Sequence, residues 1–349
     1  MLATFQRKPS PVTVVHFGLF GDEPGGMNQV VNEYLTWTSE DVHIDGQLTT
    51  RRKRDWAGVP LVLAAVARLF LLRLERRRVV AVFHLSEGGS FVREGGLLLV
   101  AKALGLPSVA HLHGADFVDF SHRRPKLVQL VLERATIIVS LTDATLDRVQ
   151  ALCGTHENLY RVPNLVSVPA LPVTKHQIVL FCGQVSRRKG YDVLADAWST
   201  LPADLRKSWT LHVAGPVHPD CAGVHPPDVV VHGAVTHEEA LALQERAAVA
   251  CLPSRAEALP MFLLEAMARA CAVLATDVGQ VSGLLSDGAG IVVAPDNAAK
   301  LAAALQDLLG DPDARVAMAE RGRARVERSF AGPQAQQSVI DVWLKAVKQ

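Results

Sequence analysis

Two glutamates eight positions apart, Glu257 and Glu265, are the residues of this chain best suited to chemistry. Glu257 lies in a predicted loop after the apolar run 249–252, which is typical of a buried strand. Pro260 suits the first turn of a helix, and the residues from Met261 onward are strong helix formers. The free backbone N–H groups at that helix start attract an anion. Two carboxylates beside an anion site indicate a ligand that carries hydroxyls, or a developing positive charge, next to its phosphates.

A second loop supplies positive charge in the same half of the chain. It runs from Gly183 to Gly190, follows the apolar run 177–182, and contains Arg187, Arg188 and Lys189. Such a triplet is usually a solvated basic turn. Here it follows a strand and a glycine, and another anion-suited loop lies in the same half. Phosphate binding by Lys189 is therefore the stronger interpretation.

The first half of the chain offers a glycine loop and two histidines. Gly25 and Gly26 separate a predicted strand from a helix without the GxGxxG pattern of a dinucleotide site, so they form either a plain turn or a close approach to a ligand. His111 and His113 share one side of a predicted strand. No third ligand is evident at a fixed spacing, so no metal site is predicted. The alternatives are a structural histidine, or a functional His113 at the strand's carboxyl end, where α/β sheets bind ligands.

Strands and helices alternate along the whole chain, and the segment 165–176, with its prolines, reads as a linker. This predicts an α/β protein of two doubly wound, Rossmann-like domains facing a central cleft, at 1–168 and 169–332. A C-terminal helix at about 333–349 is a candidate to pack back on the first domain. The predicted strands are 12–17, 79–85, 108–116 (ending in a loop), 135–140, 159–162, 177–182, 209–214, 228–231, 249–252, 271–276 and 290–293.

Composition excludes several classes of protein. A length of 349 residues favours two domains, and a formal net charge of +1 predicts no bulk attraction to nucleic acid. The five cysteines show no CxxC spacing and predict reduced thiols in a cytoplasmic protein. Residues 1–11 have charges but no apolar run after them, so no secretory signal is predicted.

The apolar segment 59–74 is interrupted by Arg68 and Arg73, and falls short of the roughly 20 apolar residues that span a bilayer. Basic clusters at 51–54 and 76–78 flank it. One alternative is a surface helix packed on a sheet, with a solvated basic end. The other is an interfacial helix on anionic lipid, which implies a peripheral protein at the inner face of a membrane.

These residues together resemble the retaining family 4 glycosyltransferases, which have the GT-B fold. Glu257 and Glu265 match the Glu-x7-Glu signature of that family. Gly183 with Lys189-Gly190 resembles its phosphate loop, and Gly25-Gly26 resembles its N-terminal glycine loop. The resemblance covers almost the whole chain and is strongest over 181–295. Further matches are His111–Gly114, Val162–Asn164 and Thr276–Gly279.

The resemblance implies a role for each matching residue. Lys189 would hold the diphosphate of a nucleotide-sugar, Glu265 the ribose hydroxyls, and Glu257 the transferred sugar, which His113 would touch from the N-terminal domain. The catalytic residues would be His113, Lys189 and Glu257. The donor-binding residues would also include Gly25 and Gly26 closing over the phosphates, Gly183, Gln184 and Arg188 in the phosphate loop, Val235 near the base, and the backbone near Leu259 and Met261.

The implied reaction is front-face transfer with retention. Negative charge grows on the departing diphosphate, and Lys189 with the helix start can stabilise it. The resemblance implies no cofactor, and leaves UDP and GDP equally open as the donor nucleotide. One departure matters most: Gln184 stands where the family usually has Arg, and Gln supplies no charge to the leaving group. Either Arg187 or Arg188 compensates for it, or turnover is low.

The sequence therefore predicts a retaining glycosyltransferase that moves a sugar from a nucleotide-diphosphate sugar to an acceptor hydroxyl. A lipid-linked saccharide of polysaccharide or glycan biosynthesis and a natural product are the candidate acceptors. One alternative is a non-catalytic nucleotide-sugar-binding or scaffold protein, which Gln184 favours and Glu257 opposes. The other is a sugar-nucleotide epimerase of similar fold, against which the Glu-x7-Glu context argues.

Overall fold

The structure is a computed structural model that describes residues 10–21, 25–51, 58–75, 78–154, 157–170, 174–226 and 228–348. The chain forms two compact units. The first holds 10–21, 27–162 and 337–348, and the second holds 25–26 and 163–336. Apart from the short segment 25–26, the chain passes from one unit to the other after Val162 and again after Gln336.

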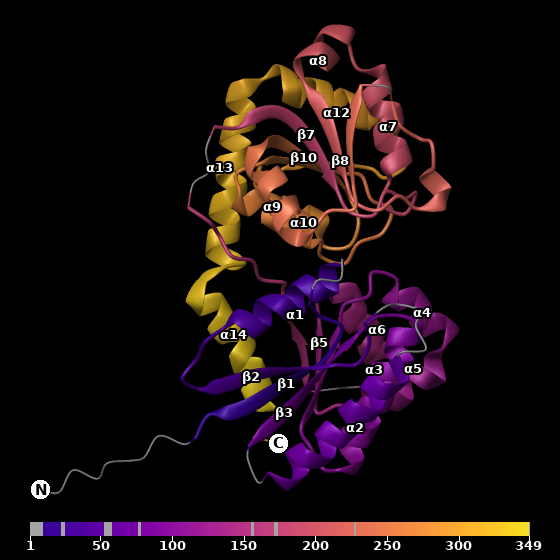
Figure 1. Cartoon of the computed structure of the whole chain (residues 1–349), viewed down its shortest axis with the longest axis vertical. Coiled ribbons are helices and arrows are strands. Elements are labelled where there is room, and N and C mark those ends of the chain that lie inside the picture. Colours follow the sequence, from indigo (N-terminus) through magenta and orange to yellow (C-terminus); the bar gives the residue numbers. More distant parts are fainter. Residues whose placement is uncertain are drawn as a thin grey trace, which may run out of the picture. The chain divides into compact units, whose positions relative to one another are not determined.

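The first unit is a parallel sheet with helices on its faces (Figure 1). The strand order is β2-β1-β3-β4-β5-β6, and every described pairing is parallel. Its strands are β1 (Val12–Gly18), β2 (Val42–Leu48), β3 (Val79–Leu85), β4 (Ser108–Leu112), β5 (Ile137–Ser140) and β6 (Leu159–Arg161). Its helices are α1 (Gly26–Thr36), α2 (Gly58–Leu74), α3 (Gly89–Ala103), α4 (Phe117–Arg123), α5 (Pro125–Leu132) and α6 (Asp143–Cys153).

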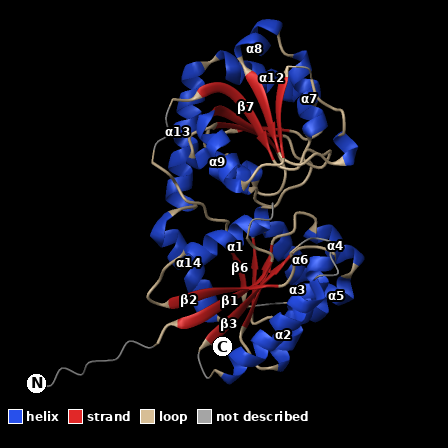
Figure 2. Ribbon diagram, in the orientation of Figure 1, coloured by secondary structure: helices blue, strands red, loops and turns tan. Residues whose placement is uncertain are grey.

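The second unit is again a sheet with helices on its faces (Figure 2). Its strand order is β12-β11-β10-β7-β8-β9. Its strands are β7 (His176–Cys182), β8 (Thr210–Ala214), β9 (Val229–Gly233), β10 (Ala247–Leu252), β11 (Ala272–Thr276) and β12 (Ile291–Val293). Its helices are α7 (Tyr191–Thr200), α8 (Ala203–Ser208), η1 (Pro219–Cys221, a 3₁₀ turn), α9 (His237–Arg246), α10 (Met261–Ala268), α11 (Val281–Leu284), α12 (Ala298–Gly310) and α13 (Pro312–Ser329). The helix α14 (Gly332–Lys345) begins in the second unit and ends in the first.

Apolar strands that are covered on both faces form the cores. Every residue of β1, β3 and β11 is buried, as expected for central parallel strands. In the first unit the side chains of α2, α3 and α5 join β1 and β3 in one apolar cluster that includes Leu69, Phe83 and Phe91. Parallel strands place all their carboxyl ends at one edge of a sheet, so the loops that follow them are neighbours.

The predicted α/β fold of two doubly wound sheets is confirmed, and each predicted strand is present. The sequence pattern does not predict the edge strand β2, because its sequence, VHIDGQL, is polar and half-buried and contains a glycine. The predicted helix at 59–74 is α2. Most of the flanking basic clusters, at 52–54 and 76–77, lies outside the described residues, as do Met1–Pro9 and part of the predicted linker, 171–173. Among the described helices, none combines the length and the apolar character needed to cross a membrane.

Candidate active site

Two loops of the second unit meet at the carboxyl ends of neighbouring strands β7 and β10. The first loop carries Lys189 and the second carries Glu257. Their side chains form an ion pair, with 2.5 Å between Lys189 Nζ and Glu257 Oε1, and they are only 18% and 9% exposed. The hydroxyl of Ser254 donates to the same carboxylate oxygen at 2.8 Å. The structure thus brings together two residues that are 68 positions apart in sequence.

Two glycines allow this approach. Gly190 has a left-handed backbone, with φ +71°, and a Cβ there would collide with the carbonyl oxygen of Pro253. Gly279, with φ +56°, has the same relation to the carbonyl oxygen of Glu257. Only glycine adopts these angles without strain and also leaves room for the neighbouring backbone. The Glu257 loop is therefore held between the loops that follow β7 and β11.

An arginine that the sequence did not single out ties the same two loops together. The guanidinium of Arg255 forms two hydrogen bonds with the carboxylate of Asp192, at 2.7 and 2.9 Å, and a third with Asp296 at 2.6 Å. Bidentate pairs of this kind fix orientation as well as distance. Arg187 also pairs with Asp192, at 3.5 Å. In contrast, Arg188 lies on the surface and donates to the backbone oxygen of Ala256 at 3.2 Å.

Glu265 lies on α10, almost completely buried, beside residues of α9. The amide of Gln244 is 3.4 Å from its carboxylate, and Nε2 of His237 is 3.8 Å from it. Burial, and the Glu265 carboxylate nearby, raise the pKa of the Cys182 thiol to about 12, so this thiol is neutral. Sequence spacing gave no sign of His237 or Gln244, because only the packing of α9 against α10 brings them to Glu265.

Backbone groups make up much of the rest of this region. Pro260 immediately precedes α10, which begins at Met261, and the first N–H groups of a helix have no partner within it. Both Leu259 and Met261 are buried. Asn164 fixes the same turn by donating to the backbone oxygen of Leu259 at 2.9 Å. The helix start therefore offers peptide N–H groups, as an anion site requires.

The other predicted donor-binding residues lie in loops. Gly183, with φ +148°, begins the loop after β7, and Gln184 is exposed in it. Val235 is half-buried in the loop after β9. Gly25 has φ +146°, and Gly26 begins α1.

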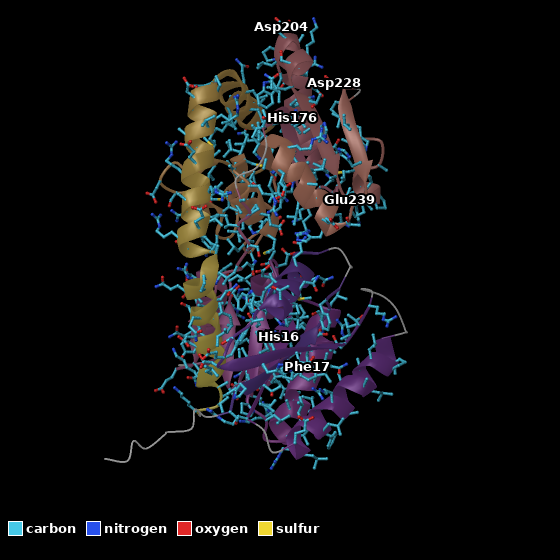
Figure 3. The ribbon with its side chains drawn as sticks, turned by 60° about the vertical axis from the view of Figure 1, so that its left-hand side comes forward. His16, Phe17, His176, Asp204, Asp228 and Glu239 are labelled. Carbon is cyan, nitrogen blue, oxygen red and sulfur yellow. The ribbon has the colours of Figure 1, made fainter. Side chains whose placement is uncertain are left out.

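The ligand end of the first unit holds a group of four histidines, in place of the two that the sequence indicated. His16 is on β1, His84 on β3, His111 on β4, and His113 directly follows β4. Nδ1 of His16 is 2.8 Å from Nε2 of His84, whose Nδ1 is 2.8 Å from Nε2 of His113. The rings of His111 and His113 are tilted by 30° to each other, with centroids 4.0 Å apart. Figure 3 labels His16 within the sheet.

Burial keeps these four imidazoles neutral. It lowers the pKa of His16 and of His113 to about 3, and it lowers the pKa of His84 and of His111 well below the ordinary value. The neighbouring imidazoles reinforce the effect at all but His113. His113 is the partly exposed member of the group. It presents a neutral ring that can donate one hydrogen bond and accept another.

Comparison with known proteins identifies the class of fold and of chemistry. Residues 168–325 match the family described as glycosyl transferases group 1. The alpha-D-kanosaminyltransferase of Streptomyces kanamyceticus is 26% identical over 299 residues, which are 74% of this chain and 77% of that protein.

Solved structures show the same fold over nearly the whole chain. The sucrose-phosphate synthase of Thermosynechococcus elongatus superposes with a TM-score of 0.74 at 17% identity, covering 97% of this chain and 99% of that one. HepE of Anabaena, in complex with UDP and glucose, gives a TM-score of 0.71 at 15% identity, covering 95% and 99%. At such low identity the likeness concerns the fold alone.

Proposed function

Since this chain is a glycosyltransferase of the GT-B fold, whose residues 168–325 belong to the glycosyl transferases group 1 family, we propose that Lys189, Glu257 and Glu265 hold its nucleotide-sugar donor. The observation that carries the proposal is the ion pair between Lys189 and Glu257 at the carboxyl ends of adjacent parallel strands. This edge of an open α/β sheet is where ligands bind.

The pair gives the donor two complementary contacts. Lys189 binds the diphosphate together with the N–H groups at the start of α10, and both stabilise the charge that grows on the leaving group. Glu257 is then free to contact the sugar, which gains positive character as its bond to phosphate breaks. Glu265, further along α10, accepts hydrogen bonds from the ribose. His113 contributes its neutral ring to the sugar, and transfer proceeds with retention.

The exposed Arg188 supplies the charge that Gln184 lacks. Arg187 and Arg255 both face Asp192, whereas no carboxylate pairs with Arg188 among the residues that the structure describes. Its guanidinium donates to a backbone oxygen and keeps its full positive charge. We therefore assign Arg188, from the two arginines that precede Lys189, as the second cation for the diphosphate.

The decisive experiment compares Lys189→Ala with Lys300→Ala, an exposed lysine of α12, against a panel of nucleotide-sugars. Donor cleavage in the absence of acceptor serves as the assay, because it needs no knowledge of the acceptor. We expect kcat/KM to fall about 10²- to 10³-fold for Lys189→Ala, as for other groups that stabilise a developing anion. Lys300→Ala should match the wild type. Full activity of Lys189→Ala would refute the site assignment.

We further propose a lipid-linked saccharide acceptor at an anionic membrane surface. The face of α2 opposite its buried residues exposes apolar side chains in a helical stripe: Val59, Leu63, Phe70, Leu71 and Leu74. An apolar stripe next to Arg73 and the basic segments of the sequence fits an interfacial helix. The acceptor hydroxyl would then be held at the membrane surface.

Flotation with vesicles that contain anionic lipid tests this second proposal. Wild-type protein should float with the vesicles, and the variant Leu63→Glu with Phe70→Glu should lose most of that binding. Val316→Glu is the matched control, because Val316 is an equally exposed apolar residue on α13. Wild-type protein that stays unbound, or a double variant that floats as well as the control, would contradict the membrane surface without affecting the donor site.

A further inference from the structure

Three of the four histidines in the first unit converge on one point. One ring nitrogen from each of His84, His111 and His113 lies within 4.8 Å of the other two. Register explains the convergence, since His84 and His111 are partners in the pairing of β3 with β4, and His113 follows two residues later. Three imidazoles from two strands are a frequent donor set for metal ions.

The buried ring of His111 lacks the partners that a structural histidine normally has. It is fully buried, and neither of its ring nitrogens has a hydrogen-bond partner within the part of the chain that the structure describes. A buried polar group without a partner is costly, and such groups in native proteins usually face a water or an ion. The unpartnered nitrogens of His111 therefore indicate a ligand independently of the grouping of the three ring nitrogens.

The hydrogen bonds of His84 orient its ring to bind a metal ion. Metal-bound histidines almost always donate their other ring N–H to a nearby acceptor, which fixes the tautomer. Nε2 of His84 lies 2.8 Å from Nδ1 of His16, so a hydrogen bond donated to His16 leaves the lone pair of His84 Nδ1 facing His113. That second contact is a hydrogen bond of 2.8 Å, and a metal ion that replaced its proton would move the two nitrogens apart to roughly 3.3 Å, the spacing on a tetrahedral zinc ion.

We propose that His84, His111 and His113 form a binding site for a late first-row divalent cation such as Zn²⁺, with its fourth position open. Neutral imidazole nitrogens favour this class of ion over Mg²⁺ or Ca²⁺, which prefer oxygen ligands. The partly exposed ring of His113 provides the entry route. Bound metal occupies the histidine that we propose for the sugar, so it blocks transfer while leaving nucleotide binding at Lys189 intact.

Zinc titration of the metal-free, full-length protein against a chromophoric chelator tests the site directly. We expect one tight site in the wild type, and at least tenfold weaker binding in His111→Gln. The control is His232→Gln, which breaks an exposed histidine pair in the second unit, where His232 and His212 are 3.0 Å apart. That variant should bind as the wild type does. Absence of a tight site, or unchanged affinity in His111→Gln, overturns the proposal.

A visible spectrum of Co²⁺ bound to the wild type tests the site without any substitution, so the result does not depend on a variant that folds. Co²⁺ in a three-histidine site with one open position gives the intense visible bands of tetrahedral cobalt, whereas weak octahedral bands would overturn the assignment. Lys189→Ala should bind Zn²⁺ like the wild type. Failure of the metal site is therefore distinguishable from failure of the donor site, because each is read without the other.

Discussion

The ligand ends of the two sheets are built from the same parallel architecture and hold opposite kinds of side chain. In the second unit the ion pair of Lys189 and Glu257 is bonded to Ser254, and the adjacent Arg255 is bound by two carboxylates. In the first unit four neutral imidazoles fill the equivalent edge, and His16 and His111 keep ring nitrogens without partners in the described structure. One edge is arranged for a charged ligand, and the other for a neutral or metal ligand.

The largest expected effect is a loss of folding stability at low pH, which should come from the histidines of the neutral edge. The folded state lowers the pKa of the four histidines, so below about pH 6.5 the unfolded chain takes up protons that the native state refuses. Stability is therefore full above that pH and is lost as the pH falls. Each histidine removes up to about 1.4 kcal/mol of unfolding free energy per pH unit. Urea unfolding with a metal chelator present, between pH 7.5 and 5, measures the slope.

A single substitution assigns this slope to the imidazoles. His16→Phe removes one titrating ring from an aromatic environment, in which Tyr34 and Trp343 lie with ring centroids 5.4 and 4.9 Å away. The slope should become shallower by about one histidine's share. His43→Gln, at an exposed position of β2, should leave it unchanged. An identical slope in His16→Phe would contradict the assignment.

The charged edge should depend on the close approach of its loops. Gly190→Ala places a methyl group against the carbonyl of Pro253 at a left-handed backbone position, so we expect about 3 kcal/mol of destabilisation and loss of donor cleavage. Gly96→Ala on α3 meets nothing within 4 Å, and should be neutral or stabilise by about 0.5–1 kcal/mol. Thermal unfolding of both variants measures the difference, and equal melting temperatures would argue against the predicted clash.

The smallest effect should come from the surface arginine. Arg188→Gln removes the cation that we propose for the diphosphate, and should lower kcat/KM about tenfold, since charged hydrogen bonds contribute about 1.5–3 kcal/mol when fully formed and less at a surface. Stability should not change. Gln184→Arg in the same background should restore activity. If kcat/KM of the double variant stays as low as that of Arg188→Gln, then Arg188 does not take the role of the arginine that the family usually has at position 184.

The charged edge could largely be predicted from the sequence, whereas only His111 and His113 of the neutral edge could. Lys189 and Gly190 belong to one loop, and Glu257 and Glu265 to one loop and helix, so local patterns reveal them. His16 and His84 lie in apolar strands 68 residues apart, and only the strand order β1-β3-β4 makes them neighbours. For the same reason the sequence did not single out Arg255, because its partner Asp192 is 63 residues away.

Because α14 ends in the first unit, it determines which unit completes its core first during synthesis. Trp343 is almost fully buried there, with its ring edge-on to His16 and to Tyr34. Residues 10–162 leave the ribosome early, yet the packing of Trp343 against His16 and Tyr34 forms only after residues 337–346 have been synthesised. The second unit, 163–336, has all its own strands before then. During synthesis, the half of the enzyme that is made first is therefore the half that completes its core last.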